Sequence, residues 1–340
     1  MNDRVRLTLD EVHRTATEAL RAKGYSERHA CAIADTVTAA ERDECTSHGL
    51  FRIPFYVKAL LEASVSPDAE PTFRDLAPAV LQADAHFGFA PLALQLAADP
   101  LERRARELGI AALCIVNAYN VAALWPEVER LAERGLVAFA FTAALRYVAP
   151  AGGTRPVYGT NPMAFAWPRA GRPPIVFDQA SSASARGEIQ IHLRDGKPIP
   201  EGWAIGPDGE PTTDPATALA GAQLPFGGYK GAAIALMVEL LAGALVGDVF
   251  SFEASEADTA GVGAPFGGEF MIAIDPARCV GDGDRDAQLA HAEALFAKVL
   301  EQDGTRLPSD RRYRARERTP TEGITIPKSL HDTLREYIDG

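Results

Sequence analysis

The pattern of apolar positions near the start of the chain is helical. Thr8-Leu9-Asp10-Glu11 has the form of a capping box, in which a hydroxyl and a later glutamate close the first helical turn. Ser26 is placed to cap a second helix, because apolar residues recur at helical spacing over Ala30–Val37 behind it. A third apolar-periodic stretch follows His48. We therefore expect residues 1–60 to be largely helical.

The pattern changes in the middle of the chain, where short β-rich runs bounded by turn residues alternate with helical periodicity. Strands are predicted at Ala111–Val116, Val137–Thr142, Met163–Ala166, Ile175–Asp178, Ile189–Leu193 and Phe270–Asp275. Helices are predicted at Leu92–Leu108, Pro126–Arg134, Gly231–Leu245, Ala287–Leu300 and Leu330–Ile338. This order predicts a mixed α/β (α+β) fold in which one substantial sheet is flanked by a helical layer from both chain ends. Residues 254–268 are small and turn-prone, which predicts a mobile surface loop or lid.

Composition narrows the class of protein. The chain has 340 residues, 47% of them hydrophobic, which is enough for a large core, and its formal charge of −12 repels phosphate backbones. The basic run Arg311–Arg316 is therefore interpreted as a solvated helix face or a set of ion-pair partners, and no nucleic-acid partner is expected. Four cysteines without a C-x-x-C pair favour buried free thiols in a reducing compartment. The sequence shows no apolar leader or membrane span, so we expect a cytoplasmic protein.

One motif suggests chemistry directly: Ser47-His48-Gly49-Leu50-Phe51-Arg52. If a helix begins at Ser47, His48 and Arg52 stand one turn apart on the same face. Arginine can hold a carboxylate through two hydrogen bonds, and the imidazole can exchange the proton that accompanies hydride transfer to C=O or C=N. Spacing alone is explained more simply by a helix start in which Ser47 caps its own backbone.

Glycine-rich turns at Tyr158–Pro162 and Leu224–Gly231 offer a second signal, because the latter joins a lysine to the start of an apolar helix, as an anion site requires. A tight entry into that helix explains it equally well. G-x-G-x-x-G, the P-loop, H-E-x-x-H and G-x-S-x-G are all absent from the sequence, and its seven histidines are scattered. We therefore predict no Rossmann fingerprint, no metal site and no serine hydrolase.

Several blocks together resemble the malate/L-lactate dehydrogenase type of NAD(P)H-dependent oxidoreductases, almost from end to end. Within that family the chain looks most like Δ1-piperideine-2-carboxylate/Δ1-pyrroline-2-carboxylate reductases. The blocks are Ser-His-Gly-Leu-Phe-Arg-Ile-Pro (47–54), Ala-Ala-Leu-Trp-Pro-Glu-Val-Glu (122–129), Tyr-Gly-Thr-Asn-Pro (158–162), Leu-Pro-Phe-Gly-Gly-Tyr-Lys-Gly (224–231), Phe-Ser-Phe-Glu (250–253) and Arg-Leu-Pro-Ser-Asp-Arg-Arg-Tyr (306–313).

The resemblance implies a non-Rossmann NAD(P)-binding core with a mixed, largely antiparallel sheet at residues 76–300. It also implies a helical substrate and dimerisation region made of residues 1–75 and 301–340, and a homodimer with its active sites near the interface. His48 would be the proton donor, Ser47 and Glu188 its relay, and Arg52 and Thr160 the binding groups for the substrate carboxylate. Cofactor contacts would come from Asn120, Val121, Ala122, Ala123, Leu124, Asp178, Gln179, Ala180, Tyr229, Lys230, Thr305, Arg306, Leu307, Pro308, Ser309, Asp310 and Arg311. Arginines in the last segment suit a 2′-phosphate, so NADPH is expected ahead of NADH.

The chain departs from the family pattern near the expected chemistry. Relatives usually carry Ser-His-His-Phe where this chain has Ala118-Tyr119-Asn120-Val121, Glu188 replaces an aspartate, Gln179 replaces an apolar residue, and Ala143 replaces an asparagine with Arg146 close behind. The expected function is NADPH-dependent reduction of a cyclic 2-imino acid to the L-amino acid. The alternatives are a 2-oxo-acid/2-hydroxy-acid dehydrogenase of malate-, lactate- or ureidoglycolate-like specificity, and a catalytically idle NADPH-binding homologue.

Overall fold

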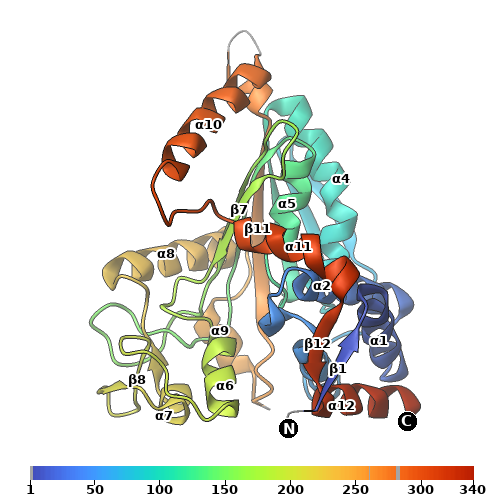
Figure 1. Cartoon of the computed structure of the whole chain (residues 1–340), viewed down its shortest axis with the longest axis vertical. Helices are drawn as coiled ribbons and strands as arrows, with labels where there is room; N and C mark the ends of the chain where they lie inside the picture. Colours follow the sequence, from blue (N-terminus) through green and yellow to red (C-terminus); the bar gives the residue numbers. More distant parts are fainter. Residues whose placement is uncertain (1–2, 260, 281–283) are drawn as a thin grey trace.

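A computed structural model describes residues 3–259, 261–280 and 284–340 of the protein. A central sheet carries helices on both faces, and the two chain ends form a separate layer beside it (Figure 1). The α-helices are α1 (Leu9–Ala22), α2 (Glu27–Arg42), α3 (Ile53–Glu62), α4 (Ala90–Leu108), α5 (Trp125–Glu133), α6 (Arg186–Arg194), α7 (Pro215–Ala220), α8 (Tyr229–Glu239), α9 (Ser251–Ala257), α10 (Arg285–Leu300), α11 (Asp310–Glu322) and α12 (Lys328–Asp339). The strands are β1 (Arg4–Leu7), β2 (Thr72–Ala77), β3 (Val80–Asp84), β4 (Ile110–Tyr119), β5 (Val137–Thr142), β6 (Met163–Trp167), β7 (Ile175–Gln179), β8 (Ala204–Ile205), β9 (Pro211–Thr212), β10 (Ala222–Gln223), β11 (Phe266–Ile274) and β12 (Ile324–Pro327).

The central sheet has the strand order β2-β3-β4-β11-β5-β6-β7. β3 and β4 are parallel and every other neighbouring pair is antiparallel. Side chains alternate across β4, so that Leu113 and Ile115 pack with α4 and α5 while Cys114 and Val116 pack with α8 and the π-helical turn Leu240–Leu245. The predicted fold class, a mixed α/β protein with a largely antiparallel sheet, is confirmed.

The layer beside the sheet is made from both ends of the chain. β1 pairs antiparallel with β12, and α1 packs against α2 and α12 (Figure 1). Thr8 and Glu11 form the predicted capping box, and the Ser26 hydroxyl accepts a hydrogen bond from the His29 N–H at the start of α2. Both predicted helix starts are therefore confirmed.

Two predicted elements are wrong. Ile189–Leu193 lies inside α6 and is not a strand, because its alternating apolar residues also fit a short helix that buries Ile189 and exposes Leu193. The predicted loop at 254–268 is shorter than expected, since α9 extends to Ala257 and β11 begins at Phe266. Residue 260 of that loop lies outside the described residues.

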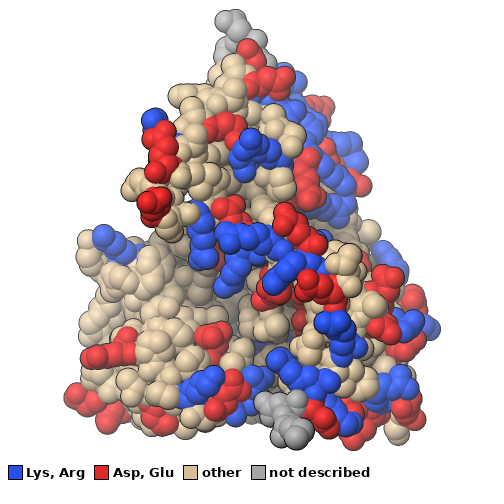
Figure 2. Space-filling model, viewed as in Figure 1, with Lys and Arg blue, Asp and Glu red and all other residues tan. Residues whose placement is uncertain are grey.

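The surface and the thiols add two observations. Lys and Arg side chains gather over α11, with acidic side chains beside them (Figure 2). All four cysteines are free, but only Cys114 is buried and Cys279 is exposed, so the expectation of buried thiols holds for Cys114 alone. Among the helices of the described residues, none has the length and apolar character needed to cross a membrane.

Candidate active site

The Ser47–Arg52 motif lies at the junction between α2 and α3. Thr46–His48 and Leu50–Arg52 form two short 3-10 turns, and α3 begins only at Ile53, so the prediction of a continuous helix from Ser47 is wrong. The Glu41 carboxylate causes the break: it accepts a hydrogen bond of 2.8 Å from the Leu50 N–H, and a Cβ on Gly49 would lie 2.1 Å from its Oε1. Only glycine leaves room for this buried acid beside the motif.

His48 and Arg52 nevertheless lie close together. Ser47 Oγ is 3.0 Å from His48 Nδ1, and Arg52 Nε donates a hydrogen bond of 2.7 Å to the Ser47 carbonyl. Burial and the charge of Arg52 lower the pKa of His48 to about 3. The motif therefore presents a neutral imidazole next to a guanidinium, and the Ser47 hydroxyl is placed to orient that imidazole as predicted.

Arg52 has no acidic partner in the part of the chain that the structure describes. Its pKa is lowered by burial, and the other groups that perturb it are Tyr56 and Tyr147, not carboxylates. Burying a guanidinium without a carboxylate partner lowers the stability of the folded protein unless an anionic ligand binds to it. Gly187, at the start of α6, approaches this side chain so closely that a Cβ would lie 3.0 Å from Arg52 Nη2. The arrangement suits an anionic ligand held by Arg52.

Arg186 is a second charged residue of this region, and the sequence prediction missed it. Its guanidinium carbon lies 3.7 Å from the centre of the Tyr147 ring, and its Nη2 donates a hydrogen bond of 3.1 Å to the Leu219 carbonyl. Burial lowers the pKa of Arg186. Arg186 could have been noticed because it directly precedes Gly187 and Glu188 in the sequence. The segment Ile189–Leu193 was predicted as a strand, however, so no helix was expected to begin at Arg186.

The other predicted polar residues lie near this region with fewer contacts. Glu188 is exposed, its Oε1 lies 4.0 Å from His192 Nε2, and within the described ranges it makes no hydrogen bond to Ser47 or His48. The Thr160 carbonyl accepts hydrogen bonds from the Ser181 N–H and hydroxyl, at 2.8 and 2.9 Å. The roles of Glu188 and Thr160 stay predictions. No group of three or more His, Cys, Asp or Glu side chains among the described residues is arranged to hold a metal ion.

The predicted cofactor segments meet around the end of β7. The Leu124 and Trp125 N–H groups donate to Asp178 at 2.9 and 3.1 Å, which caps the start of α5. The Ser309 hydroxyl bonds both backbone groups of Val176, and the Phe226 N–H donates to the Ser181 carbonyl. Residues 120–124, 178–180 and 305–311 thus converge, and Tyr229 and Lys230 begin α8 just after the loop that contains Phe226.

The charges in these segments suit a phosphorylated ligand. Arg306, Arg311 and Lys230 are exposed, and none of them makes an ion pair within the residues that the structure describes. Burial raises the pKa of Asp178 to about 6, against the hydrogen bonds that it accepts. The Arg312 Nε is buried and has no hydrogen-bond partner among residues 3–259, 261–280 and 284–340. Together these groups fit the polar body of a dinucleotide.

Two of the departures from the family pattern, Tyr119 and Asn120, make contacts within the fold. Asn120 donates to Glu269 at 2.8 Å and accepts from the Ala122 N–H at 3.0 Å, while Tyr119 packs against Phe89 and Phe266. These two side chains therefore support the fold of the 118–122 segment. In a second region, Arg146 faces Glu256 at 3.3 Å.

Ala143, beside Arg146, packs in the apolar cluster between the sheet and α8. Within the described residues, neither Arg146 nor Ala143 contacts the Ser47–Arg52 motif through an ion pair or a hydrogen bond.

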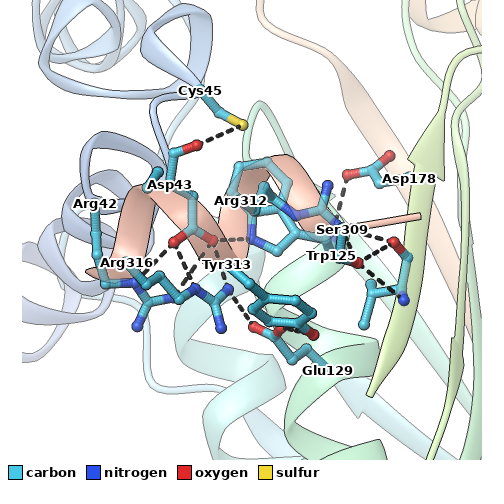
Figure 3. Close-up of polar contacts among 12 residues, drawn as sticks. Arg42, Asp43, Cys45, Trp125, Glu129, Asp178, Ser309, Arg312, Tyr313 and Arg316 are labelled. Atoms are coloured by element: carbon cyan, nitrogen blue, oxygen red, sulfur yellow. Dashed lines mark hydrogen bonds and ion pairs between the residues drawn. The ribbon is translucent and has the colours of Figure 1, made fainter. Parts of the chain in front are cut away.

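A network of paired charges lies next to the Ser47–Arg52 motif, and Trp125 contacts both the network and the motif. Asp43 is fully buried, accepts a hydrogen bond of 3.0 Å from Trp125 Nε1, and pairs with Arg316, which also reaches Glu129 at 2.6 Å (Figure 3). The His48 ring meets the Trp125 ring edge-on, with 6.5 Å between centroids. The interpretation of the Arg311–Arg316 run as ion-pair partners is confirmed for Arg316.

The chain is similar to known proteins in sequence and in fold. The family model for malate/L-lactate dehydrogenase matches residues 7–335. A Δ1-pyrroline-2-carboxylate/Δ1-piperideine-2-carboxylate reductase of Pseudomonas aeruginosa is 52% identical over 98% of this chain and 100% of its own length. An NADP(+)-dependent (2R)-3-sulfolactate dehydrogenase of Chromohalobacter salexigens is 43% identical, covering 97% of both chains. The crystal structure of a Δ1-piperideine-2-carboxylate reductase from Pseudomonas syringae has a TM-score of 0.91 at 39% identity, covering 98% of this chain and 99% of its own. The chain belongs to the malate/L-lactate dehydrogenase family of oxidoreductases.

Proposed function

We propose that the protein reduces a cyclic 2-imino acid, Δ1-pyrroline-2-carboxylate or Δ1-piperideine-2-carboxylate, to the L-amino acid with NADPH. The observation that carries this proposal is Arg52, a half-buried guanidinium without an acidic partner in the described residues, next to the neutral imidazole of His48. The printed names of the relatives, including the reductase that is 52% identical, support imine reduction.

Each residue of the motif has a role in this reaction. Arg52 binds the substrate carboxylate through its two Nη groups, because its Nε is already bonded to the Ser47 carbonyl. The carboxylate offsets the charge of Arg52, one of the two causes of the low pKa of His48, so substrate binding favours the protonated imidazole. His48 then donates its proton to the imine nitrogen while Ser47 holds Nδ1.

Glu188 is the acid of the relay in this proposal, since Gly187 places the first turn of α6 against Ser47 and Arg52. Thr160 is the second group proposed for the carboxylate.

The cofactor, when bound, supplies the hydride. The segments around the end of β7 and the start of α8 would hold it, with the exposed Arg306 and Arg311 facing a 2′-phosphate and Lys230 facing the pyrophosphate. The relative whose name includes NADP(+) supports the choice of NADPH over NADH.

A substrate panel tests the proposal. We expect NADPH-dependent turnover of at least one of the two cyclic imines, and a loss of about a hundredfold in His48→Ala, the usual size of a general-acid contribution. Turnover of pyruvate, oxaloacetate or 3-sulfopyruvate without turnover of either imine would favour a 2-oxo-acid reductase, which the sulfolactate dehydrogenase relative makes the second candidate. NADPH binding without turnover of any of these substrates would identify an idle homologue.

We further propose that the protein is a homodimer. Large apolar side chains of α8 and the turn that follows it lie on the surface: Leu236 is 45% exposed, Leu240 50% and Leu245 59%. Such a stripe is typical of an interface between subunits. Light scattering on the purified protein would measure its mass directly, and a monomer would contradict the proposal.

A further inference from the structure

Two glutamates meet beside residues 120–124, one of the segments proposed for the cofactor. Glu127 lies in the first turn of α5, and Glu269 lies on β11, where it is 1% exposed. A hydrogen bond joins their carboxyl groups, and among the residues that the structure describes no lysine or arginine acts on either of them. This acid pair, Glu127 and Glu269, therefore lacks the cation that neutralises Asp43.

The contact within the acid pair requires a proton. Two carboxylates have only acceptors, so a hydrogen bond between them forms when one of the two is protonated. Glu127 Oε2 and Glu269 Oε1 are both buried, and no donor in the described part of the chain reaches either oxygen. Burial, together with the neighbouring Glu269 and Asp178, raises the pKa of Glu127 well above its usual value. Glu127 therefore holds the proton and donates it to Glu269.

The charges around the acid pair do not replace this proton. Asp178 of β7 is itself an acid, and its charge acts on Glu127. Asp35 of α2 and Arg130 of α5 line the same cavity as Glu127, which has a volume of about 160 Å³. Both have partners of their own, which are His13 for Asp35 and Asp99 for Arg130. The residues paired with Glu269 on β4 and β5 are uncharged.

Asn120 connects the acid pair to the cofactor segment. Its Nδ2 donates a hydrogen bond of 2.8 Å to Glu269 Oε2, and its Oδ1 accepts one of 3.0 Å from the Ala122 N–H. At the other end of the segment, the Leu124 N–H donates to Asp178 at 2.9 Å. A carboxyl group thus holds each end of the segment, and the one at the Asn120 end is bonded to a second acid.

We propose that the proton shared by Glu127 and Glu269 fixes Asn120 and, through it, the backbone of residues 120–124 in the position that binds the nicotinamide cofactor. The two glutamates are then positioning residues that act through Asn120. Without the proton, two carboxylates would face each other in a buried place, and Glu269 would move away from Glu127. This proposal rests on the proposed function in one respect, that residues 120–124 contact the cofactor.

Infrared difference spectroscopy tests the proton directly. The C=O stretch of a protonated carboxyl group is separate from that of a carboxylate, and the difference between wild type and Glu127→Gln at pH 8 isolates the acid pair. We expect the wild type to show a protonated carboxyl band that Glu127→Gln lacks, because the glutamine amide donates to Glu269 through an N–H that does not titrate. Identical carboxyl bands in the two proteins would overturn the proposal.

Cofactor affinity tests the positioning. Fluorescence titration with NADPH would compare the wild type with Glu127→Met, which removes the donor, and with Glu127→Gln, which restores one at similar size. We expect Glu127→Met to bind NADPH about tenfold more weakly, the effect of losing one hydrogen bond to a charged group, and Glu127→Gln to recover to within about threefold of the wild type. Unchanged affinity in Glu127→Met, or equal weakening in both variants, would contradict the positioning role.

Two further variants complete this test. Glu107→Met is the matched control, because Glu107 is an exposed glutamate of α4 and its removal changes the net charge equally; NADPH affinity should stay within about twofold of the wild type. Asn120→Met takes the place of Glu127→Met if that variant does not fold, since it breaks the same connection from the side of the segment. It should also bind NADPH about tenfold more weakly, and an affinity within about threefold of the wild type would overturn the proposal.

Failure of the proposed function gives a different result. The titration uses no substrate, so a protein that reduces neither imine still reports on the acid pair, and a parallel titration with NADH covers the other cofactor preference. If neither nucleotide binds the wild type, the proposed function and the positioning role both fail. If imines are reduced and Glu127→Met binds NADPH as the wild type does, the proposed function stands and the positioning role does not.

Discussion

Two clusters of buried charge lie on either side of Trp125, and they differ in whether their charges are paired. On one side Asp43 forms ion pairs with Arg42 and Arg316 and accepts a hydrogen bond from Trp125 Nε1 (Figure 3). Glu129 forms a second ion pair with Arg316. On the other side Arg52 and His48 lie together without a carboxylate among the described residues. Among the residues that the structure describes, only the charges of the first cluster are paired with one another.

Two acids at the end of α2 show the same difference. Burial would raise the pKa of Asp43, but hydrogen bonds from Arg316 and Arg42 lower it below its usual value. Glu41 is buried and has no cationic partner in the described part of the chain, and burial raises its pKa to about 7, although it accepts a hydrogen bond from the Leu50 N–H. Asp43 and Glu41 are only two residues apart, and the presence or absence of arginine partners decides whether each buried carboxyl group is ionised at neutral pH.

The difference separates stability from function. A charge that is buried and paired holds elements together, here the end of α2, the start of α5 and α11, and breaking the pair leaves a buried ion alone. A charge that is buried without a partner does not stabilise the free protein, so its presence indicates a ligand. Substitutions in the two clusters should therefore have opposite consequences.

The largest effect is expected for Arg316→Met. Removing this guanidinium leaves the fully buried Asp43 and the nearly buried Glu129 without their shared partner. The free energy of unfolding should fall by about 3–5 kcal/mol, the cost of breaking a buried ion pair. Urea unfolding followed by circular dichroism measures this change.

The matched control is Arg335→Met, which removes an exposed arginine that pairs with Asp339 within α12. Its cost should stay below about 0.5 kcal/mol. Equal losses in the two variants would mean that the Asp43 cluster is not the structural centre that its burial indicates.

Glu41→Gln should change how stability depends on pH. The folded-state pKa of Glu41, about 7, lies above the ordinary value of 4.5, so the folded state keeps a proton that the unfolded state releases between these values. This stabilisation is present below pH 4.5 and is lost as the pH rises through 7. Glutamine keeps an acceptor for the Leu50 N–H and does not titrate.

The measurement is the difference in unfolding free energy between Glu41→Gln and the wild type at pH 5 and pH 8. It should shift by about 2–3 kcal/mol in favour of the variant at the higher pH. A difference that stays constant across this range would show that Glu41 is ionised in the folded state, as Asp43 is.

The two clusters were not equally visible in the sequence. The Ser47–Arg52 motif stood out because its residues are adjacent, and the strands β4, β5, β6, β7 and β11 followed from local β-rich runs. The sequence assigned no role to Asp43 or to the Trp125 side chain, because two of the partners of Asp43 come from α5 and α11, 82 and 273 residues away along the chain. Pairing over such separations is decided by the tertiary fold and leaves no local pattern.

Local sequence patterns also gave wrong predictions where contacts of side chains determine the backbone conformation. The break at Gly49 depends on the Glu41 carboxylate from the preceding helix, which no periodicity reports. α6 was predicted as a strand because a five-residue apolar alternation fits both periods. That error concealed Arg186, since a residue at the start of a helix cannot be placed while the helix itself is missed.

Arg52→Met should have the opposite profile to Arg316→Met. Loss of the carboxylate-binding group should lower kcat/KM for the imine by roughly fifty- to a hundredfold, or about 2.5 kcal/mol. The free energy of unfolding should not fall, because the variant removes a desolvated charge that has no acid beside it in the described residues. Steady-state kinetics and urea unfolding on the same preparation give both numbers, and a loss of stability above 1 kcal/mol would contradict the comparison.

Trp125→Phe should have the smallest effect, and it acts on both clusters. The substitution removes the hydrogen bond from Nε1 to Asp43 but keeps an aromatic ring facing His48. Asp43 retains Arg316 and Arg42, so the loss in stability should be about 1 kcal/mol, the net value of one hydrogen bond.

Turnover should fall less than threefold if the ring alone positions the imidazole. A larger fall in kcat with unchanged KM would mean that the paired cluster holds His48 in place through Trp125, and Asp43→Asn should then reproduce it. That result would join the two regions into one site.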